Sequence, residues 1–206
     1  MMRCLLLGLG LLLVASGLNA GTQAPPFYRQ PIDLSWFTKA VAESDELVVY
    51  EGLPHPGFEK ADYEIELLRV PVFAVDKQML YQRALAVEEA DRGRLRTIFH
   101  DGEAWVKPMA GEYRMKLCGG FHADFAVGWL KKKDALAYAL ICFGCHEIRF
   151  VDRDHSVTTD LVPRGYADLR NILKEYRQER PVPGRDKRVK ALKPPPPPLP
   201  KVEYLP

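Results

Sequence analysis

The sequence has no strong excess of charge and no hydrophobic run long enough to span a membrane. Its 29 Lys and Arg residues nearly balance its 27 Asp and Glu residues, and the net charge is +2. This balance favours neither nucleic-acid binding nor adsorption to an acidic membrane surface. The apolar run over residues 4–15 is shorter than the roughly 20 residues that a membrane-spanning helix needs. We therefore expect no transmembrane segment in the mature chain.

Motifs that would point to catalysis are also missing. The chain has no nucleophile elbow, no phosphate-binding glycine loop and no pair of carboxylates in a catalytic setting. The Gly119-Gly120 pair is too short to cradle a phosphate and serves better as a flexible entry to a strand. Enzymatic activity is the class of function that the sequence supports least.

The first 20 residues have the pattern of a secretory signal peptide. Arg3 provides the positive charge, the apolar run follows, and small residues lead to a cleavage point after Ala20. The chain is therefore predicted to be exported to the periplasm or the extracellular space. After the signal, residues 21–31 form an extended lead-in, residues 32–180 one domain, and residues 181–206 a basic, proline-rich tail.

The domain is predicted to be α+β, with a mainly antiparallel sheet and a few flanking helices. Apolar residues recur at helical spacing in three segments and alternate or cluster as in strands in six others. The expected helices cover residues 35–43, 88–99 and 166–177. The expected extended segments cover residues 47–50, 70–75, 104–107, 113–117, 121–129 and 135–151.

The tail is expected to be disordered. Pro194 to Pro198 form an unbroken proline run, which is extended and has no internal hydrogen bonds. The basic residues between Lys174 and Lys193, among them Arg180, have the composition of a solvated linker. The tail could bind an envelope component or a protein that recognises proline-rich segments.

Removal of the signal peptide removes Cys4 and leaves an odd number of cysteines. Thiols pair in an oxidising compartment, so Cys118, Cys142 and Cys145 need an explanation. In the favoured interpretation Cys118 and Cys145 form a cross-strand disulfide and Cys142 is a small core residue. No cofactor is required by this arrangement.

Two cofactor alternatives use the same cysteines. Cys142-Phe143-Gly144-Cys145-His146 has the C-x-x-C-H pattern of covalent haem attachment. In that case Cys142 and Cys145 hold the haem and His146 binds the iron. A zinc site would instead use spacings typical of tetrahedral sites. The candidate sixth haem ligands are Met109, Met115 and His155, and the candidate zinc ligands are Cys118, His122, Cys142 and Cys145.

The turn Lys131-Lys132-Lys133-Asp134 predicts a hairpin between the strands on either side. We expect odd-numbered residues of one strand to face even-numbered residues of the other, because this separates apolar from polar side chains. Cys142 and Cys145 then point to opposite faces of a strand, which argues against haem. The expected apolar face holds Phe121, Phe125, Val127, Leu140, Cys142, Ile148 and Phe150. The expected polar face holds Cys118, His122, Asp124, Cys145 and Glu147.

Three further polar residues are candidates for the site. His122 and Asp124 are two residues apart on one strand face, so Asp124 could orient the imidazole, although such pairs more often mark a solvent-facing side. His55 lies between two prolines in a rigid loop.

Three blocks of sequence carry a resemblance. They are Tyr50-Glu51-Gly52-Leu53-Pro54-His55, Cys118-Gly119-Gly120-Phe121-His122 and Cys142-Phe143-Gly144-Cys145. Together they resemble a group of uncharacterised exported bacterial proteins that carry the same blocks in the same order. The resemblance covers about residues 46–180. It implies a shared domain in which the three blocks form one spatial unit, and it implies no activity.

These observations lead to one functional hypothesis. The chain is expected to be an exported, non-enzymatic binding or structural module of the cell envelope, stabilised by a disulfide. The competing class is a cofactor protein that carries either haem or zinc.

Overall fold

The computed structural model describes residues 31–108, 119–181 and 203–204. In this part of the chain, four α-helices, one short 3-10 helix and nine strands are formed. The helices are α1 (Ser35–Glu43), α2 (Lys60–Arg69), α3 (Glu89–Asp101), α4 (Pro163–Leu173) and the 3-10 helix η1 (Lys174–Tyr176). The strands are β1 (Glu46–Glu51), β2 (Val72–Val75), β3 (Gln78–Tyr81), β4 (Leu85–Ala86), β5 (Phe125–Lys131), β6 (Asp134–Cys142), β7 (Glu147–Val151), β8 (Ser156–Asp160) and β9 (Glu203–Tyr204).

The strands form two sheets. The larger has the order β4-β1-β5-β6-β7-β8, and every neighbouring pair in it is antiparallel. The smaller has the order β3-β2-β9, in which β3 is antiparallel and β9 parallel to β2. The chain is thus a single α+β domain built on a mainly antiparallel sheet, as predicted.

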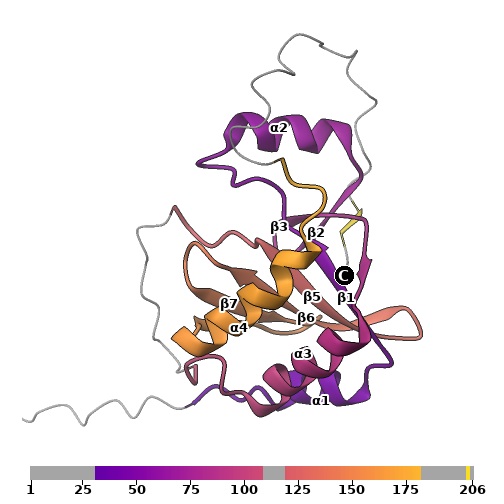
Figure 1. The fold of residues 1–206 in the computed structure, drawn as a ribbon, viewed down its shortest axis with the longest axis vertical. Coiled ribbons are helices and arrows are strands. Elements are labelled where there is room, and N and C mark those ends of the chain that lie inside the picture. Colours follow the sequence, from indigo (N-terminus) through magenta and orange to yellow (C-terminus); the bar gives the residue numbers. More distant parts are fainter. Residues whose placement is uncertain (1–30, 109–118, 182–202, 205–206) are drawn as a thin grey trace, which may run out of the picture.

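Helices α1, α3 and α4 cover one face of the six-stranded sheet (Figure 1). Phe37 of α1 is fully buried there, and its ring contacts the rings of Phe99, Trp129 and Phe150 at centroid distances of 4.5–6.0 Å. Aromatic rings bury large areas and pack edge to face, so this cluster attaches α1 and α3 to the sheet.

The opposite face of the sheet is also covered. Phe73, Val75 and Leu80 of the small sheet pack there against Ala126 and Leu140. Helix α2 lies beyond the small sheet, at one end of the molecule (Figure 1). The central strands are therefore buried on both sides, which explains why they read as nearly continuous apolar runs.

The three predicted helices are present, and a fourth was missed. The predicted segment 166–177 corresponds to α4 and η1, whose residues Leu169, Ile172, Leu173 and Tyr176 are buried as expected. Helix α2 was not predicted because it packs lightly on the rest of the molecule, and its one fully buried residue is the polar Glu66. Its string of good helix formers was the local signal for it.

The predicted hairpin is formed, but its predicted register is wrong over most of its length. Lys132 and Lys133 have positive φ angles of 53° and 76°, as in a two-residue turn that suits the strand twist. An irregularity between Trp129 and Leu130 then shifts the pairing by one residue, so Phe125 pairs with Ile141. The predicted apolar face is corrected accordingly, because Leu140 faces the side opposite to Phe125.

The predicted strand over residues 135–151 is also corrected. It is interrupted at residues 143–146 by a turn, and β6 and β7 pair on either side of it. The predicted segment 121–129 begins as a strand at Phe125, and segment 104–107 contributes one bridge, Trp105 to Leu161. Segment 113–117, all but the last residue of the lead-in, and most of the tail lie outside the described residues. Within the described ranges, no helix has the length and apolar character needed to cross a bilayer.

Candidate functional site

The loop that follows β1 holds His55 in a fixed orientation. The backbone N–H groups of Gly57 and Phe58 donate to His55 Nδ1 at 2.9 and 3.2 Å. Because Nδ1 accepts these bonds, the proton of the neutral ring is on Nε2. Burial lowers the pKa of His55, and the nearby Arg180 lowers it further, while the charges of Glu59 and Asp124 act in the opposite direction.

His122 lies against this ring, with the two centroids 4.8 Å apart. Its Nε2 is 2.7 Å from the carbonyl oxygen of Leu53, which can only accept, so Nε2 is the protonated nitrogen. Burial lowers the pKa of His122 to about 4, despite the opposing charge of Asp124. The solvent-facing interpretation of this residue is wrong, because His122 is 7% exposed.

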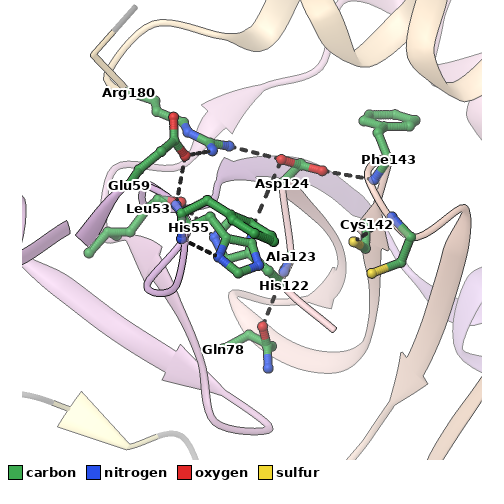
Figure 2. Close-up of polar contacts among 12 residues, drawn as sticks. Leu53, His55, Glu59, Gln78, His122, Ala123, Asp124, Cys142, Phe143 and Arg180 are labelled. Atoms are coloured by element: carbon green, nitrogen blue, oxygen red, sulfur yellow. Dashed lines mark hydrogen bonds and ion pairs between the residues drawn. The ribbon is translucent and has the colours of Figure 1, made fainter. Parts of the chain in front are cut away.

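Asp124 connects His122 to the Cys142 block (Figure 2). Its Oδ1 is 4.0 Å from His122 Nδ1, and its Oδ2 accepts a hydrogen bond of 2.7 Å from the backbone N–H of Phe143. The prediction that His55, the Cys118 block and the Cys142 block form one spatial unit is confirmed for His55, His122 and the Cys142 block. Cys118 itself lies outside them.

Arg180 is the centre of the ionic contacts at this site (Figure 2). Its Nη1 donates to Asp124 Oδ1 at 2.8 Å, and its Nη2 donates to Glu59 Oε2. Glu59 Oε2 also accepts the backbone N–H of His55 at 2.8 Å. Burial opposes the ionisation of Glu59, but the bonds from His55 and Arg180 outweigh it, and the pKa of Glu59 is lowered. We call Glu59, Asp124 and Arg180 the ionic bridge.

The side chain of Glu51, at the end of β1, binds the backbone of the segment that contains Arg180. Glu51 Oε2 accepts hydrogen bonds from the N–H groups of Gln178, Glu179 and Arg180 at 2.7–3.2 Å. Glu51 is 1% exposed, and a buried carboxylate needs such donors. Arg180, the last residue of the predicted domain, is therefore held by the fold, and the interpretation of the basic residues from Lys174 onward as a solvated linker is wrong for Arg180.

Cys142 is the last residue of β6, and Cys145 and His146 lie in the turn that follows, so the prediction that Cys142 and Cys145 point to opposite faces of one strand is wrong. The backbone N–H of Cys145 lies 3.2 Å from Cys142 Sγ and donates to it. Cys142 is a free, buried thiol, whereas Cys145 is disulfide-bonded. The predicted partner, Cys118, lies outside the described residues. The pairing Cys118–Cys145 therefore stays a prediction.

The haem ligands proposed from the sequence are separated by this arrangement. His146 is exposed and lies against Tyr166, with the ring centroids 4.3 Å apart. His155 is at the other end of the five-residue strand β7, which separates the two by about 17 Å. The two imidazoles cannot bind the same iron. Met109 and Met115 lie outside the described residues.

The zinc ligands are brought together in part. His122 and Cys142 are neighbours, because the backbone N–H of His122 donates to the sulfur of Cys142. The sulfur of Cys145 is held in a disulfide and is not available as a thiolate. Among the residues that the structure describes, no group of three His, Cys, Asp or Glu side chains is arranged to hold a metal.

Asp124 and Arg180 also line a cavity of about 450 Å³. Its walls come from the ends of β1 and β5, the Phe143-Gly144 turn, α4, η1 and the segment after η1. The residues that line it are Glu51, Asp124, Phe125, Phe143, Gly144, Tyr166, Arg170, Lys174, Arg177 and Arg180. The sequence did not predict that Glu51, Glu59 and the cations of α4 and η1 belong to this site.

Comparison with known proteins adds no relative. No protein-family description, no curated protein and no solved structure matches this chain. The resemblance of the three blocks to exported bacterial proteins stays a prediction.

Proposed function

We propose that this chain is an exported, non-enzymatic binding module of the cell envelope. The observation that supports the proposal is that the ionic bridge connects separate segments of the chain next to an open cavity. Both carboxylate oxygens of Asp124 are engaged, one by Phe143 N–H and one by Arg180. These contacts fix the position of residues that line the cavity, and ligand-binding sites are usually preformed in this way.

The reactive groups at the site are poorly suited to catalysis. A nucleophilic thiol needs to ionise easily and to be reachable, but Cys142 is 3% exposed and burial raises the pKa of its thiol. His122 donates its Nε2 proton to Leu53 O, so that proton is used in a structural bond. We therefore propose a binding role rather than acid–base or thiol chemistry.

Haem remains the main competing proposal because of one observation. The turn at residues 143–146 gathers Cys142 and Cys145, whose sulfur and backbone nitrogen are 3.2 Å apart. A turn suits haem attachment better than the strand expected from the sequence. Both sulfurs would have to be free thiols when haem is attached, whereas Cys145 is held in a disulfide. The disulfide favours the binding module.

The intact mass of the exported protein separates these classes. The protein would be produced in a host able to attach haem and measured after denaturation without reductant. The expected mass is that of a chain beginning at Gly21 with two hydrogens fewer than the reduced form. Cys118→Ser is expected to abolish this loss of mass, and Cys142→Ser to leave it intact. A gain of about one haem mass would make electron transfer the function, since thioether bonds survive unfolding. A fully reduced chain that carries zinc before denaturation would contradict the proposal in the same way.

The proline run at residues 194–198 is proposed to meet an envelope component or a protein partner. The full chain and a chain ending at residue 181 would be compared by cross-linking in intact cells. The proposal expects cross-linked products that depend on residues 182–206. Identical products from both chains would remove the tail from the binding role.

A further inference from the structure

The cavity beside the ionic bridge has a cationic rim. Arg170, Lys174 and Arg177 lie at helical spacing along α4, η1 and the residue that follows, and all three side chains are exposed. Two carboxylates also line the cavity, against four cations when Arg180 is counted, and each carboxylate already has polar contacts within the protein. Asp124 is bound to Arg180, and Glu51 accepts three backbone N–H groups. Positive charge is therefore in excess at the opening.

The rim cations are weakly held by the protein itself. Arg170 has no carboxylate partner within the described residues, and its Nη1 makes one long hydrogen bond of 3.4 Å to the hydroxyl oxygen of Tyr166. Lys174 lies 3.8 Å from Glu175, but both side chains are more than half exposed, and such pairs contribute little. Arg177 Nε is 3.6 Å from Glu51 Oε1, which is beyond hydrogen-bonding distance. Arg170 and Lys174 are therefore free to turn toward a ligand, whereas Arg177 is the cation that lies beside the buried Glu51 Oε1.

The inner wall of the cavity is aromatic. Phe143 packs edge to face against Tyr166 at a centroid distance of 5.4 Å and against Phe125 at 6.2 Å. Phe125 is buried, while Phe143 and Tyr166 are partly exposed. Rings of this kind offer flat surfaces against which another flat group can stack.

From these two features we infer that the cavity binds a small organic anion, with a carboxylate or phosphate group on a flat apolar body. Guanidinium groups match the two oxygens of a carboxylate or phosphate, so Arg170 can bind the anionic group, with the ammonium group of Lys174 one helical turn away. The apolar body would lie against Phe143 and Tyr166. A neutral apolar ligand would bury the rim cations without compensation, and an inorganic anion would leave the rings unused.

This inference rests on the proposed binding function and names the class of its ligand. The size of the cavity agrees with it, since about 450 Å³ is in the range of small-molecule sites. The nearly balanced charge of the chain does not favour a nucleic acid as the ligand.

The test is a titration of the ¹⁵N-labelled mature protein followed by amide chemical shifts. The probes are phenyl phosphate, benzoate, inorganic phosphate and the neutral benzyl alcohol. Saturable shifts at Phe143, Gly144 and Tyr166 are expected with phenyl phosphate or benzoate, and the stronger of the two identifies the preferred oxyanion. Inorganic phosphate and benzyl alcohol are expected to bind at least about tenfold more weakly.

Matched variants separate a site from general attraction to positive charge. The double variant Arg170→Gln with Lys174→Gln is expected to weaken binding by about tenfold or more. Arg164→Gln serves as the control, because Arg164 is also exposed on α4 but does not line the cavity. The amide spectrum of each variant checks that it is folded. Equal loss of binding in both variants would overturn the inference.

Two other outcomes would also overturn it: no saturable shifts with any probe, or equally strong binding of benzyl alcohol. The absorption spectrum and zinc content of the same sample are measured before the titration. A sample that carries haem or zinc contradicts the proposed function whatever the titration gives. A disulfide-bonded, cofactor-free sample that binds no probe contradicts this inference alone.

Discussion

Arg180 and Asp124 are 56 residues apart in the sequence, yet Arg180 Nη1 donates to Asp124 Oδ1 at 2.8 Å. Their side chains are 11% and 22% exposed. The contact joins the end of the domain to the entry of β5, and Glu59 on the other side of Arg180 ties in the His55 loop. One guanidinium thus holds together three distant parts of the chain.

Arg180→Gln is expected to lower the free energy of unfolding by about 3 kcal/mol, because two largely buried carboxylates lose their shared cation. Urea denaturation of the mature protein measures this change. Arg164→Gln is the control. Arg164 is 87% exposed and only weakly paired with Asp168, so its loss is expected to change stability by less than about 0.5 kcal/mol. Equal effects of the two substitutions would show that the ionic bridge adds no stability.

The free energy of unfolding is expected to decrease as the pH is lowered, because of His122. Burial lowers the pKa of this residue to about 4 from its ordinary 6.5, so between these values the unfolded chain binds more protons than the folded one. Acid therefore favours unfolding. The contribution of His122 is complete above about pH 6.5 and is lost as the pH falls through 4, with a total of about 3 kcal/mol.

Free energies of unfolding measured between pH 4.5 and 7 test this prediction. Below that window the lowered pKa of Glu59 adds a second acid-dependent loss of stability. His122→Gln keeps an N–H donor for Leu53 O but removes the titrating ring, so the variant is expected to show a flatter dependence on pH. His100→Gln, at an exposed position of α3, is the control. An unchanged slope in the His122 variant would refute the assignment.

Much of the fold could be predicted from local pattern. Helix α1 has its apolar residues on one side, as its sequence pattern predicted, and Asp33 Oδ1 accepts the N–H of Ser35 at its start. The hairpin register could not be predicted, because both faces of β5 and β6 are buried. Val127 and Ala126 are each fully buried on opposite sides, so apolar alternation does not tell one register from the other.

The candidate site was predictable only in part, for a similar reason. His55 stood out between its two prolines, and His122 and Asp124 stood out through their two-residue spacing. The roles of Glu51 and Arg180 could not be predicted, because their partners come from residues up to 129 positions away in the sequence. An exposed and a buried charged residue look the same in a sequence when the partner is distant. Among the described residues, the buried acids and Arg180 were thus found only through their contacts.

Gly52→Ala is expected to destabilise the protein by about 3 kcal/mol or more. A Cβ atom at Gly52 would lie 1.8 Å from the carbonyl oxygen of Ala123, and backbone on both sides would have to move. Gly93→Ala is the matched control, because a Cβ there meets nothing within 4 Å and the residue is inside α3. That substitution is expected to stabilise the protein by about 0.5–1 kcal/mol. Thermal or urea unfolding of both variants is the measurement, and a neutral Gly52→Ala would show that β1 and β5 approach less closely.

Cys142 is expected to resist alkylation in the folded protein. Its side chain is 3% exposed, and burial raises the pKa of its thiol, so both access and thiolate formation are disfavoured. Iodoacetamide at pH 8 is expected to modify it at least about 100-fold more slowly in the folded chain than in urea. In urea without reductant one cysteine of the mature chain should react, and after reduction all three should. Fast modification of Cys142 in the folded protein would instead indicate an accessible thiol and would restore thiol chemistry as a candidate function.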